Sequence, residues 1–152
     1  MILTVEPTES GLQGELIPPG DKSVSHRALI FSRLAVGRSE RSGWLDSEAS
    51  LATLKAWEQL VAVVERSDGK IFVTGTGGKL RPPPDGRLDM GNSGTAMRLL
   101  AGVLSGQEFD STLSGDESLN SRPMGRIVIP LTLMGADISA TGAGTAPLLV
   151  RG

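Results

Sequence analysis

The sequence predicts an α/β (α+β) fold made of two copies of a βαβαββ unit. Helix-like stretches, in which apolar residues recur every three or four positions, alternate with short strand-like stretches and with turns rich in glycine and proline. Landmark residues also recur in the same order: Gly20 and Arg27 are seven residues apart, and so are Gly91 and Arg98. An internal repeat as long as the stretch from Gly20 to Gly91 is typical of a duplicated supersecondary unit.

The first half is expected to contain two strands, a helix, a strand, a second helix and a hairpin. After Ser23, helical spacing predicts the apolar face of the first helix, which Gly37 is expected to end. Its residues are Val24, Ala28, Phe31 and Ala35, joined by Ile30 and Leu34. In order, these elements are expected at residues 2–6, 12–17, 23–36, 38–44, 48–61, 61–65 and 70–74.

The second half repeats much of this order after a linker at residues 75–86, which is rich in glycine and proline. Pro123 suits the first position of the later helix, because its missing N–H group costs nothing there. The expected order is a strand, a helix, a strand, a polar stretch, a helix and a hairpin, at residues 88–90, 95–105, 109–113, 114–122, 123–134 and 137–151.

Length and composition exclude several classes of protein. A chain of 152 residues suffices for one domain but not for two large ones. Its net charge of −2 and its 3% of aromatic residues disfavour a nucleic-acid-binding module. No apolar stretch reaches the roughly 18 residues of a membrane helix, and the first residues do not resemble a signal peptide, so we expect a cytoplasmic protein without a membrane partner. The absence of cysteine excludes disulfides and thiolate metal sites.

The first candidate site is the start of the first helix, where Lys22, Ser23 and Arg27 follow a turn of two prolines and a glycine. A helix start presents unpaired N–H groups and the positive end of the helix dipole, so cationic side chains beside it predict a site for a phosphate or a carboxylate. Ser23 and Arg27 are four residues apart and share one helix face. The alternative interpretation is a helix cap with a solvated arginine.

The second copy offers a similar helix start, with Gly94 in the place of Ser23 and Arg98 in the place of Arg27. A glycine lets a ligand approach the backbone closely. Arg122 precedes a proline, which biases it away from helical geometry, so it is expected to project from a helix start. A simple turn glycine and a solvated arginine are the alternatives, and Arg98 could instead hold the acidic loops. If the repeat is real, the two helix starts are expected to converge on one ligand; the alternative is that Gly and Arg occur at helix starts in any α/β chain.

The remaining titratable residues near these helices are interpreted as structural. His26 is the only histidine, and on a helix it is more often packed than catalytic. Asp46, Glu48, Asp116 and Glu117 lack the spacing of metal ligands and are expected to cap helices or to pair with basic residues. No metal site is predicted.

Four stretches resemble the 5-enolpyruvylshikimate-3-phosphate synthase family, also called 3-phosphoshikimate 1-carboxyvinyltransferase. They are PGDKSVSHRALIFSRLAVG (19–37), LDSEAS (45–50), LDMGNSGTAMRLLAG (88–102) and LSGDESLNSRPMGRIVIPLTLMGA (113–136). The resemblance implies transfer of the enolpyruvyl group of phosphoenolpyruvate to the 5-hydroxyl of shikimate 3-phosphate, without a metal or an organic cofactor. By motif it implies a catalytic Lys22 that contacts both substrates, with Ser23 and Arg27 on shikimate 3-phosphate, Gly94 and Arg122 on phosphoenolpyruvate, and Asn92 and Arg98 lining the site.

The resemblance also implies an architecture, the inside-out barrel of six βαβαββ units in two domains. This chain has about a third of the family's length, so it resembles an N-terminal fragment with two units, at about residues 20–78 and 86–152, and without the third unit of its domain. Residues 1–19 would form strands of the other domain. We therefore expect no activity from this chain alone, activity when a complementary C-terminal chain is present, and exposed apolar surfaces in its absence.

Two alternatives remain at this stage. A UDP-N-acetylglucosamine enolpyruvyltransferase shares the fold and the phosphoenolpyruvate chemistry, although its members usually carry Asn where this chain has Ser23. The chain could also be a non-catalytic anion-binding fragment. If the family assignment holds, Gly94 leaves room that an alanine methyl would fill, so a reconstituted enzyme is expected to be inhibited by glyphosate, a phosphoenolpyruvate mimic.

Overall fold

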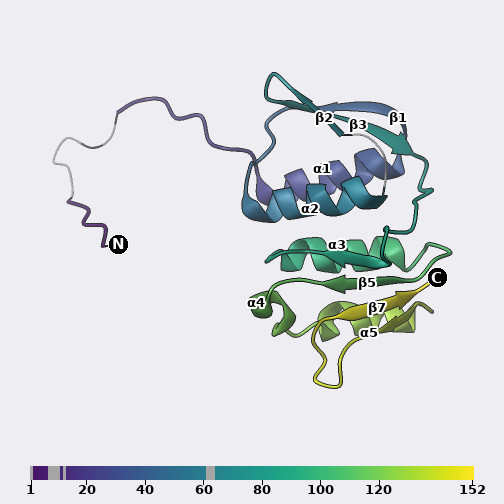
Figure 1. Cartoon of the computed structure of the whole chain (residues 1–152). Helices are drawn as coiled ribbons and strands as arrows, with labels where there is room; N and C mark the ends of the chain where they lie inside the picture. The colour runs from purple at the N-terminus through teal and green to yellow at the C-terminus, as the bar shows by residue number, and fades with distance from the viewer. Residues whose placement is uncertain (1, 7–10, 12, 61–63) are drawn as a thin grey trace.

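The computed structural model describes residues 2–6, 11, 13–60 and 64–152 of the chain. Its body has two layers, each consisting of a β-sheet with its own helices (Figure 1). The mixed α/β class predicted from the sequence is therefore confirmed. The predictions that involve Leu12 and Val61 lie outside the described residues.

The first layer combines two helices with an antiparallel sheet of three strands in the order β1-β3-β2. Asp21 caps the first helix by accepting a hydrogen bond from the N–H of Val24 at 2.7 Å. Ser47 caps the second in the same way, from the N–H of Ser50 at 3.2 Å. The elements are α1 (Lys22–Leu34), β1 (Val36–Arg41), α2 (Glu48–Leu60), β2 (Val64–Ser67) and β3 (Lys70–Thr76).

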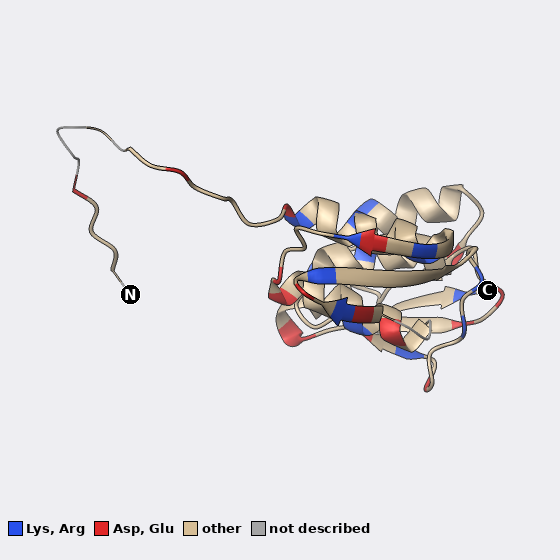
Figure 2. Cartoon of the chain, turned by 90° about the horizontal axis from the view of Figure 1, so that it is seen from above, with Lys and Arg blue, Asp and Glu red and all other residues tan. Residues whose placement is uncertain are grey.

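Opposite charges face one another across the strands of this sheet (Figure 2). Arg38 on β1 pairs with Glu65 on β2 at 3.0 Å, and Lys70 on β3 pairs with Glu40 on β1. Such exposed pairs contribute at most about 1 kcal/mol each. They keep this sheet surface polar.

The second layer has a sheet of four strands in the order β4-β5-β7-β6, in which only β4 and β5 run parallel. Apart from one short extra helix, α4, its elements follow the order βαβαββ, as predicted. They are β4 (Arg87–Asp89), α3 (Gly94–Leu104), β5 (Ser111–Ser114), α4 (Glu117–Asn120), α5 (Gly125–Leu133), β6 (Asp137–Ser139) and β7 (Leu148–Arg151).

The two layers share one connection pattern. The order β1-β3-β2 in the first sheet corresponds to β5-β7-β6 in the second, with antiparallel pairing throughout. Among the described residues, the first sheet has no strand in the place that β4 takes in the second. This agreement fits the internal repeat predicted from the sequence.

The core includes strand residues of both sheets and the contact between the helices of the first layer and α3 (Figure 1). Trp57 and Leu60 of α2 are fully buried, as are Met97 and Leu100 of α3. The packing of α2 against α3 sets the relation between the starts of these helices, which positions the site described below.

Among the residues that the structure describes, neither of the two strands predicted before the first helix is formed. Residues 2–6 and 13–20 have neither helix nor strand, and the segment extends away from the body (Figure 1). Its apolar side chains are exposed, with Ile2 at 96% and Ile17 at 93%. A strand needs a neighbouring strand to pair with, and no described strand pairs with residues 2–6 or 13–20.

The predicted apolar face of α1 is wrong in part, because Ile30 is buried as predicted and Leu34 packs against the core, but the other large apolar residues of that face are exposed. Val24 is 54% exposed and Phe31 is 65% exposed, whereas His26 and Arg33 are fully buried. The polar side chains turn inward because they find partners there: the Nδ1 atom of His26 lies 2.7 Å from the hydroxyl of Thr53 on α2, and the guanidinium of Arg33 donates to a β3 carbonyl.

Several predicted boundaries also differ from the structure. Gly37 lies within β1, because the helix already ends at Leu34 and Ala35 caps it in an extended conformation. Pro123 precedes α5 instead of opening it, since it pairs with Thr145 in an isolated β-bridge. The polar stretch after β5 contains α4, which Asp116 caps. That short helix was not predicted.

Candidate anion-binding site

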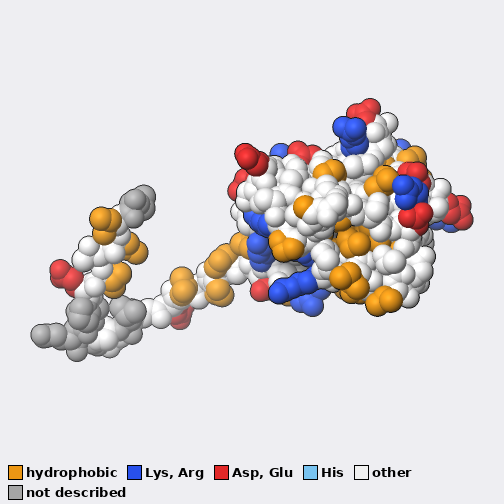
Figure 3. Space-filling view, turned by 90° about the horizontal axis from the view of Figure 1, so that it is seen from below, with side chains coloured by type: hydrophobic (Ala, Val, Ile, Leu, Met, Phe, Trp, Pro, Cys, Tyr) orange, Lys and Arg blue, Asp and Glu red, His pale blue; other side chains and the backbone are white. Residues whose placement is uncertain are grey.

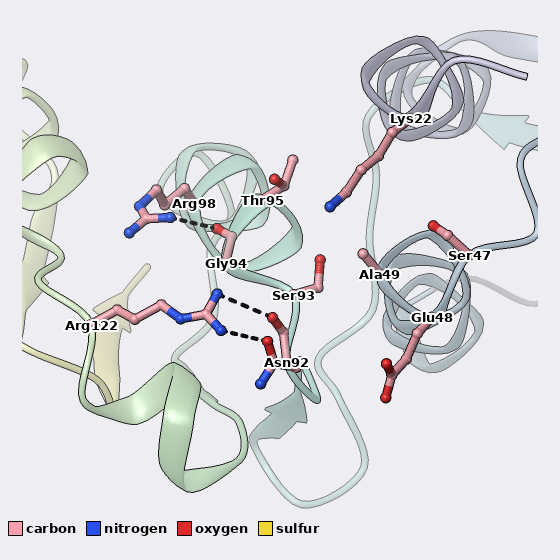
Figure 4. A pocket seen from close by; sticks show the side chains of 10 residues that line it. All are labelled: Lys22, Ser47, Glu48, Ala49, Asn92, Ser93, Gly94, Thr95, Arg98 and Arg122. Carbon is pink, nitrogen blue, oxygen red and sulfur yellow. Dashed lines mark hydrogen bonds between the residues drawn. The ribbon is translucent and has the colours of Figure 1, made fainter. Parts of the chain in front are cut away.

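A cavity of about 400 Å³ lies where the first residues of three helices converge (Figure 4). Its lining includes five of the residues singled out from the sequence, namely Lys22, Asn92, Gly94, Arg98 and Arg122. Three of them are cationic. The helix starts and the positive side chains give the cavity the character expected of an anion site.

Lys22 reaches the cavity from the first turn of α1. Its ammonium group points toward the start of α3 (Figure 4). The side chain is exposed, and among the described residues its ammonium forms no hydrogen bond or ion pair. An ammonium group on a flexible side chain, without such a partner among the described residues, is suited to contact an incoming anion.

The start of α3 forms one wall of the cavity. The hydroxyl of Ser93 caps the helix by accepting a hydrogen bond from the N–H of Ala96 at 3.2 Å. The next residue, Gly94, has no room for a side chain: a Cβ atom there would lie 2.8 Å from Nη1 of Arg98 and 3.4 Å from Nη1 of Arg122. The glycine therefore allows both guanidinium groups to approach the helix start.

The two arginines are held by the backbone around them. Arg98 donates to the carbonyl of Gly94 at 3.3 Å and to the carbonyl of Pro123 at 3.2 Å, so it ties the start of α3 to the residue after Arg122. Arg122 donates to the carbonyl oxygen and to the side-chain Oδ1 of Asn92, and to the hydroxyl of Ser118 at 3.2 Å. Arg98 thus has a structural role as well as a place in the lining.

The other two predicted site residues lie elsewhere. Ser23 and Arg27 are exposed on α1, and neither lines the cavity. The Nε–H of Arg27 donates to the carbonyl of Ser23 at 3.2 Å. Arg27 instead borders a second, largely apolar hollow of about 390 Å³, which it shares with residues of α1 and α3 such as Phe31 and Leu99.

Five lining residues were not predicted to belong to the site. They are Ser47, Glu48, Ala49, Ser93 and Thr95. Three of them stand at the start of α2, which the sequence marks by its cap but does not place beside α3. Only the packing of α2 against α3 reveals this neighbourhood.

Two of the four acidic residues, Asp46 and Asp116, have the structural roles predicted for them. Asp46 pairs with Arg66 at 3.3 Å, and Asp116 caps α4 by accepting from the N–H of Leu119 at 2.7 Å. Glu48 and Glu117 lie in the first turns of α2 and α4, where a negative charge interacts favourably with the helix dipole. Among the described residues, no group of three His, Asp or Glu side chains is placed to hold a metal ion.

His26 is packed between α1 and α2 and does not line the cavity. Burial lowers its pKa below 6.5, and the nearby charge of Lys22 adds to this effect. The imidazole is therefore neutral at neutral pH. This agrees with the structural interpretation of His26.

Comparison with known proteins decides the family. Residues 7–152 match the family model for EPSP synthase (3-phosphoshikimate 1-carboxyvinyltransferase). The chain belongs to the EPSP synthase family. Of the two enolpyruvyltransferases considered from the sequence, the matched model is that of the shikimate enzyme.

Relatives and solved structures in the EPSP synthase family are similar over nearly the whole chain. The 3-phosphoshikimate 1-carboxyvinyltransferase of Alkalilimnicola ehrlichii is 51% identical over 142 residues, which are 93% of this chain and 32% of the relative. That of Streptococcus uberis is 50% identical over 136 residues, 90% of this chain and 32% of the relative. The structure of EPSP synthase from Acinetobacter baumannii superposes with a TM-score of 0.86 at 47% identity, covering 91% of this chain and 32% of that one.

The chain spans about a third of the length of these relatives. No helix in the described ranges is both long and apolar enough to cross a membrane.

Proposed function

We propose that this chain forms part of the active site of an enolpyruvyltransferase. The reaction transfers the enolpyruvyl group of phosphoenolpyruvate to the 5-hydroxyl of shikimate 3-phosphate and releases phosphate. The observation that carries the proposal is the convergence of Lys22, Arg98 and Arg122 with the starts of α2 and α3 around one cavity. Both substrates are anions, and both would be attracted by this charge.

Each residue has a proposed role that follows from its position. Lys22 is free to contact both substrates and is the catalytic residue of this chain, because its ammonium can stabilise negative charge that develops during the transfer. Arg122 and the bare backbone at Gly94 bind phosphoenolpyruvate. Asn92 and Arg98 line the site and hold these groups.

Ser23 and Arg27 are proposed to bind the phosphate of shikimate 3-phosphate outside the cavity. They lie one turn apart on α1, next to Lys22, and both are exposed. Their separation from Arg122 is consistent with two substrates that meet at Lys22. No cofactor is required for this chemistry.

We further propose that activity requires a complementary chain that corresponds to the remaining two thirds of the relatives. It would supply the groups that move protons and would cover apolar surface. Val24 and Phe31 on α1 and Leu133 on α5 are exposed at 54%, 65% and 83%. Hydrophobic side chains are visible on one face beside a group of Lys and Arg side chains (Figure 3). Such surface is typical of an interface.

We place this activity in the cytoplasm and assign it no nucleic-acid or membrane partner. The net charge is −2, and the basic residues gather locally around one site instead of forming a long stripe.

The test is a transferase assay with both substrates on the chain alone and on the chain mixed with the remaining portion of a relative. We expect no turnover from the chain alone and turnover from the mixture, which Lys22→Gln abolishes. Turnover by the chain alone would refute the need for a partner. Shikimate 3-phosphate binding without turnover, even in the mixture, would indicate a non-catalytic anion-binding fragment.

A further inference from the structure

Asp116 uses its two carboxylate oxygens for two different tasks. Its Oδ1 atom caps α4 through the N–H of Leu119 at 2.7 Å. Its Oδ2 atom accepts a hydrogen bond from the side-chain Nδ2 of Asn92, also at 2.7 Å. The cap explains only the first of these contacts. The second connects Asp116 to the cavity, which Asn92 lines.

The second contact determines the direction in which the Asn92 amide points. A carboxylate only accepts hydrogen bonds, so it selects the NH₂ end of the amide. The oxygen end is then left for the guanidinium of Arg122, which donates to Oδ1 and to the backbone carbonyl of Asn92. The three side chains form one polarised chain of hydrogen bonds, from carboxylate to amide to guanidinium.

The backbone fixes Asp116 independently of Arg122. The N–H of Asp116 donates to the carbonyl of Gly91 at 2.9 Å. Gly115 lies so close to this carbonyl that a Cβ atom there would be 2.3 Å from its oxygen. The side chain of Asn120 bonds both the N–H and the carbonyl of Gly115, at 3.0 and 2.6 Å. The carboxylate is therefore a fixed point on which the amide can be oriented.

The electrostatics agree with this arrangement. The hydrogen bond from Asn92 lowers the pKa of Asp116 most strongly, the Leu119 N–H lowers it further, and the charge of Arg122 also contributes. The carboxylate is consequently ionised at neutral pH and remains a pure acceptor.

We infer that Asp116 is a positioning residue: through the Asn92 amide it fixes the guanidinium of Arg122 at the cavity, ready for an anionic substrate. The expected effect on phosphoenolpyruvate binding rests on the proposed function. The orientation of Arg122 in the free chain is independent of the proposed function.

The variants that test this inference change the polarity of the chain of hydrogen bonds and keep its shape. Asp116→Asn retains a side chain that caps a helix as well as Asp does. It presents an NH₂ group to Asn92, so the Asn92 amide must turn and bring its own NH₂ group against Arg122. The double variant Asp116→Asn with Asn92→Asp restores an acceptor for both donors. Asp137→Asn is the matched control. Asp137 lies on the edge strand β6, away from the cavity, and pairs with Arg151 on β7.

The first readout is the order of the Arg122 guanidinium, measured by ¹⁵N relaxation in the ligand-free chain. We expect Asp116→Asn to increase its mobility, the double variant to restore its order, and Asp137→Asn to leave it unchanged. An Arg122 that is equally ordered in Asp116→Asn would overturn the inference, whether or not the enzyme assay succeeds. An equal effect of Asp137→Asn would overturn it as well.

The second readout is the KM for phosphoenolpyruvate in the reconstituted enzyme. We expect Asp116→Asn to raise it about tenfold, the change that corresponds to roughly 1.4 kcal/mol, with kcat and the KM for shikimate 3-phosphate unchanged. The double variant is expected to recover most of this loss. A fall in kcat without a change in this KM would contradict a positioning role. A reconstituted enzyme without activity, together with a mobile Arg122 in Asp116→Asn, would refute the proposed function but not the positioning role.

Discussion

At the scale of single residues, the structure shows why the lone histidine is not part of the site. The hydroxyl of Thr53 donates to the carbonyl of Ala49 at 3.2 Å, so its oxygen can accept from Nδ1 of His26 at 2.7 Å. The Nε2 atom of His26 is buried and has no partner among the described residues. A proton added at Nε2 would place a charge in the core without compensation.

This predicts a dependence of stability on pH. The folded-state pKa of His26 lies below its unfolded value of 6.5, so the unfolded chain binds a proton first as the pH falls. The free energy of unfolding is expected to be constant above about pH 7 and to decrease between pH 6.5 and the lowered pKa. Urea unfolding at a series of pH values measures this change in the free energy of unfolding. The variant His26→Asn is expected to lose this slope, and an equal slope in both proteins would contradict the account.

A second prediction concerns Gly94. In the reconstituted enzyme, Gly94→Ala is expected to raise the KM for phosphoenolpyruvate about tenfold, because the methyl group pushes the Arg98 and Arg122 guanidinium groups away from the helix start. Glyphosate is expected to inhibit the enzyme with Gly94 and to inhibit the variant less. Steady-state kinetics measure both effects.

Gly102→Ala provides the matched control for Gly94→Ala. It lies on the same helix, and beyond the backbone of that helix no atom of the described residues lies within 4 Å of the added methyl group. We expect it to stabilise α3 by about 0.5–1 kcal/mol and to leave the kinetics unchanged. If Gly94→Ala also left the KM and the inhibition unchanged, the proposed contact at this glycine would be wrong.

At the scale of elements, most helices and strands could be predicted because their signals are local. The cap of α2 at Ser47, the hairpin turn at Asp68 and Gly69, and the apolar stripe of α3 are all encoded within a few residues. The buried face of α1 could not be predicted in this way. Its buried side depends on partners from α2 and β3, which are distant in the sequence.

The corrected face of α1 can be tested by two truncations. Leu29→Ala removes a side chain that is 1% exposed and is expected to lower the free energy of unfolding by about 2–5 kcal/mol. Phe31→Ala removes a larger side chain that is 65% exposed and is expected to cost about 0.5 kcal/mol or less. Urea denaturation of both variants decides between the two faces. The opposite ranking would favour the face predicted from hydrophobic spacing.

At the scale of the whole molecule, the residues singled out from the sequence can be compared with those that line the cavity. Two helix starts with arginine one turn along indicated an anion site, and Lys22, Gly94 and Arg122 do line one cavity. The start of α2 was missed, because its place beside α3 follows from core packing around Trp57 and Leu100. Ser23 and Arg27 lie outside the cavity, and Arg27 borders the apolar hollow between α1 and α3.

The measurement that tests the central claim most directly is an NMR titration of the isotopically labelled chain with phosphoenolpyruvate. We expect saturable shifts at the Lys22 ammonium, the Arg122 guanidinium and the backbone amides of residues 93–96. Lys22→Gln is expected to weaken them, whereas Lys55→Gln, on the exposed side of α2, is expected to leave them unchanged. Saturable shifts that avoid the cavity, or that are equal in Lys22→Gln and the unaltered chain, would contradict an anion site at these helix starts.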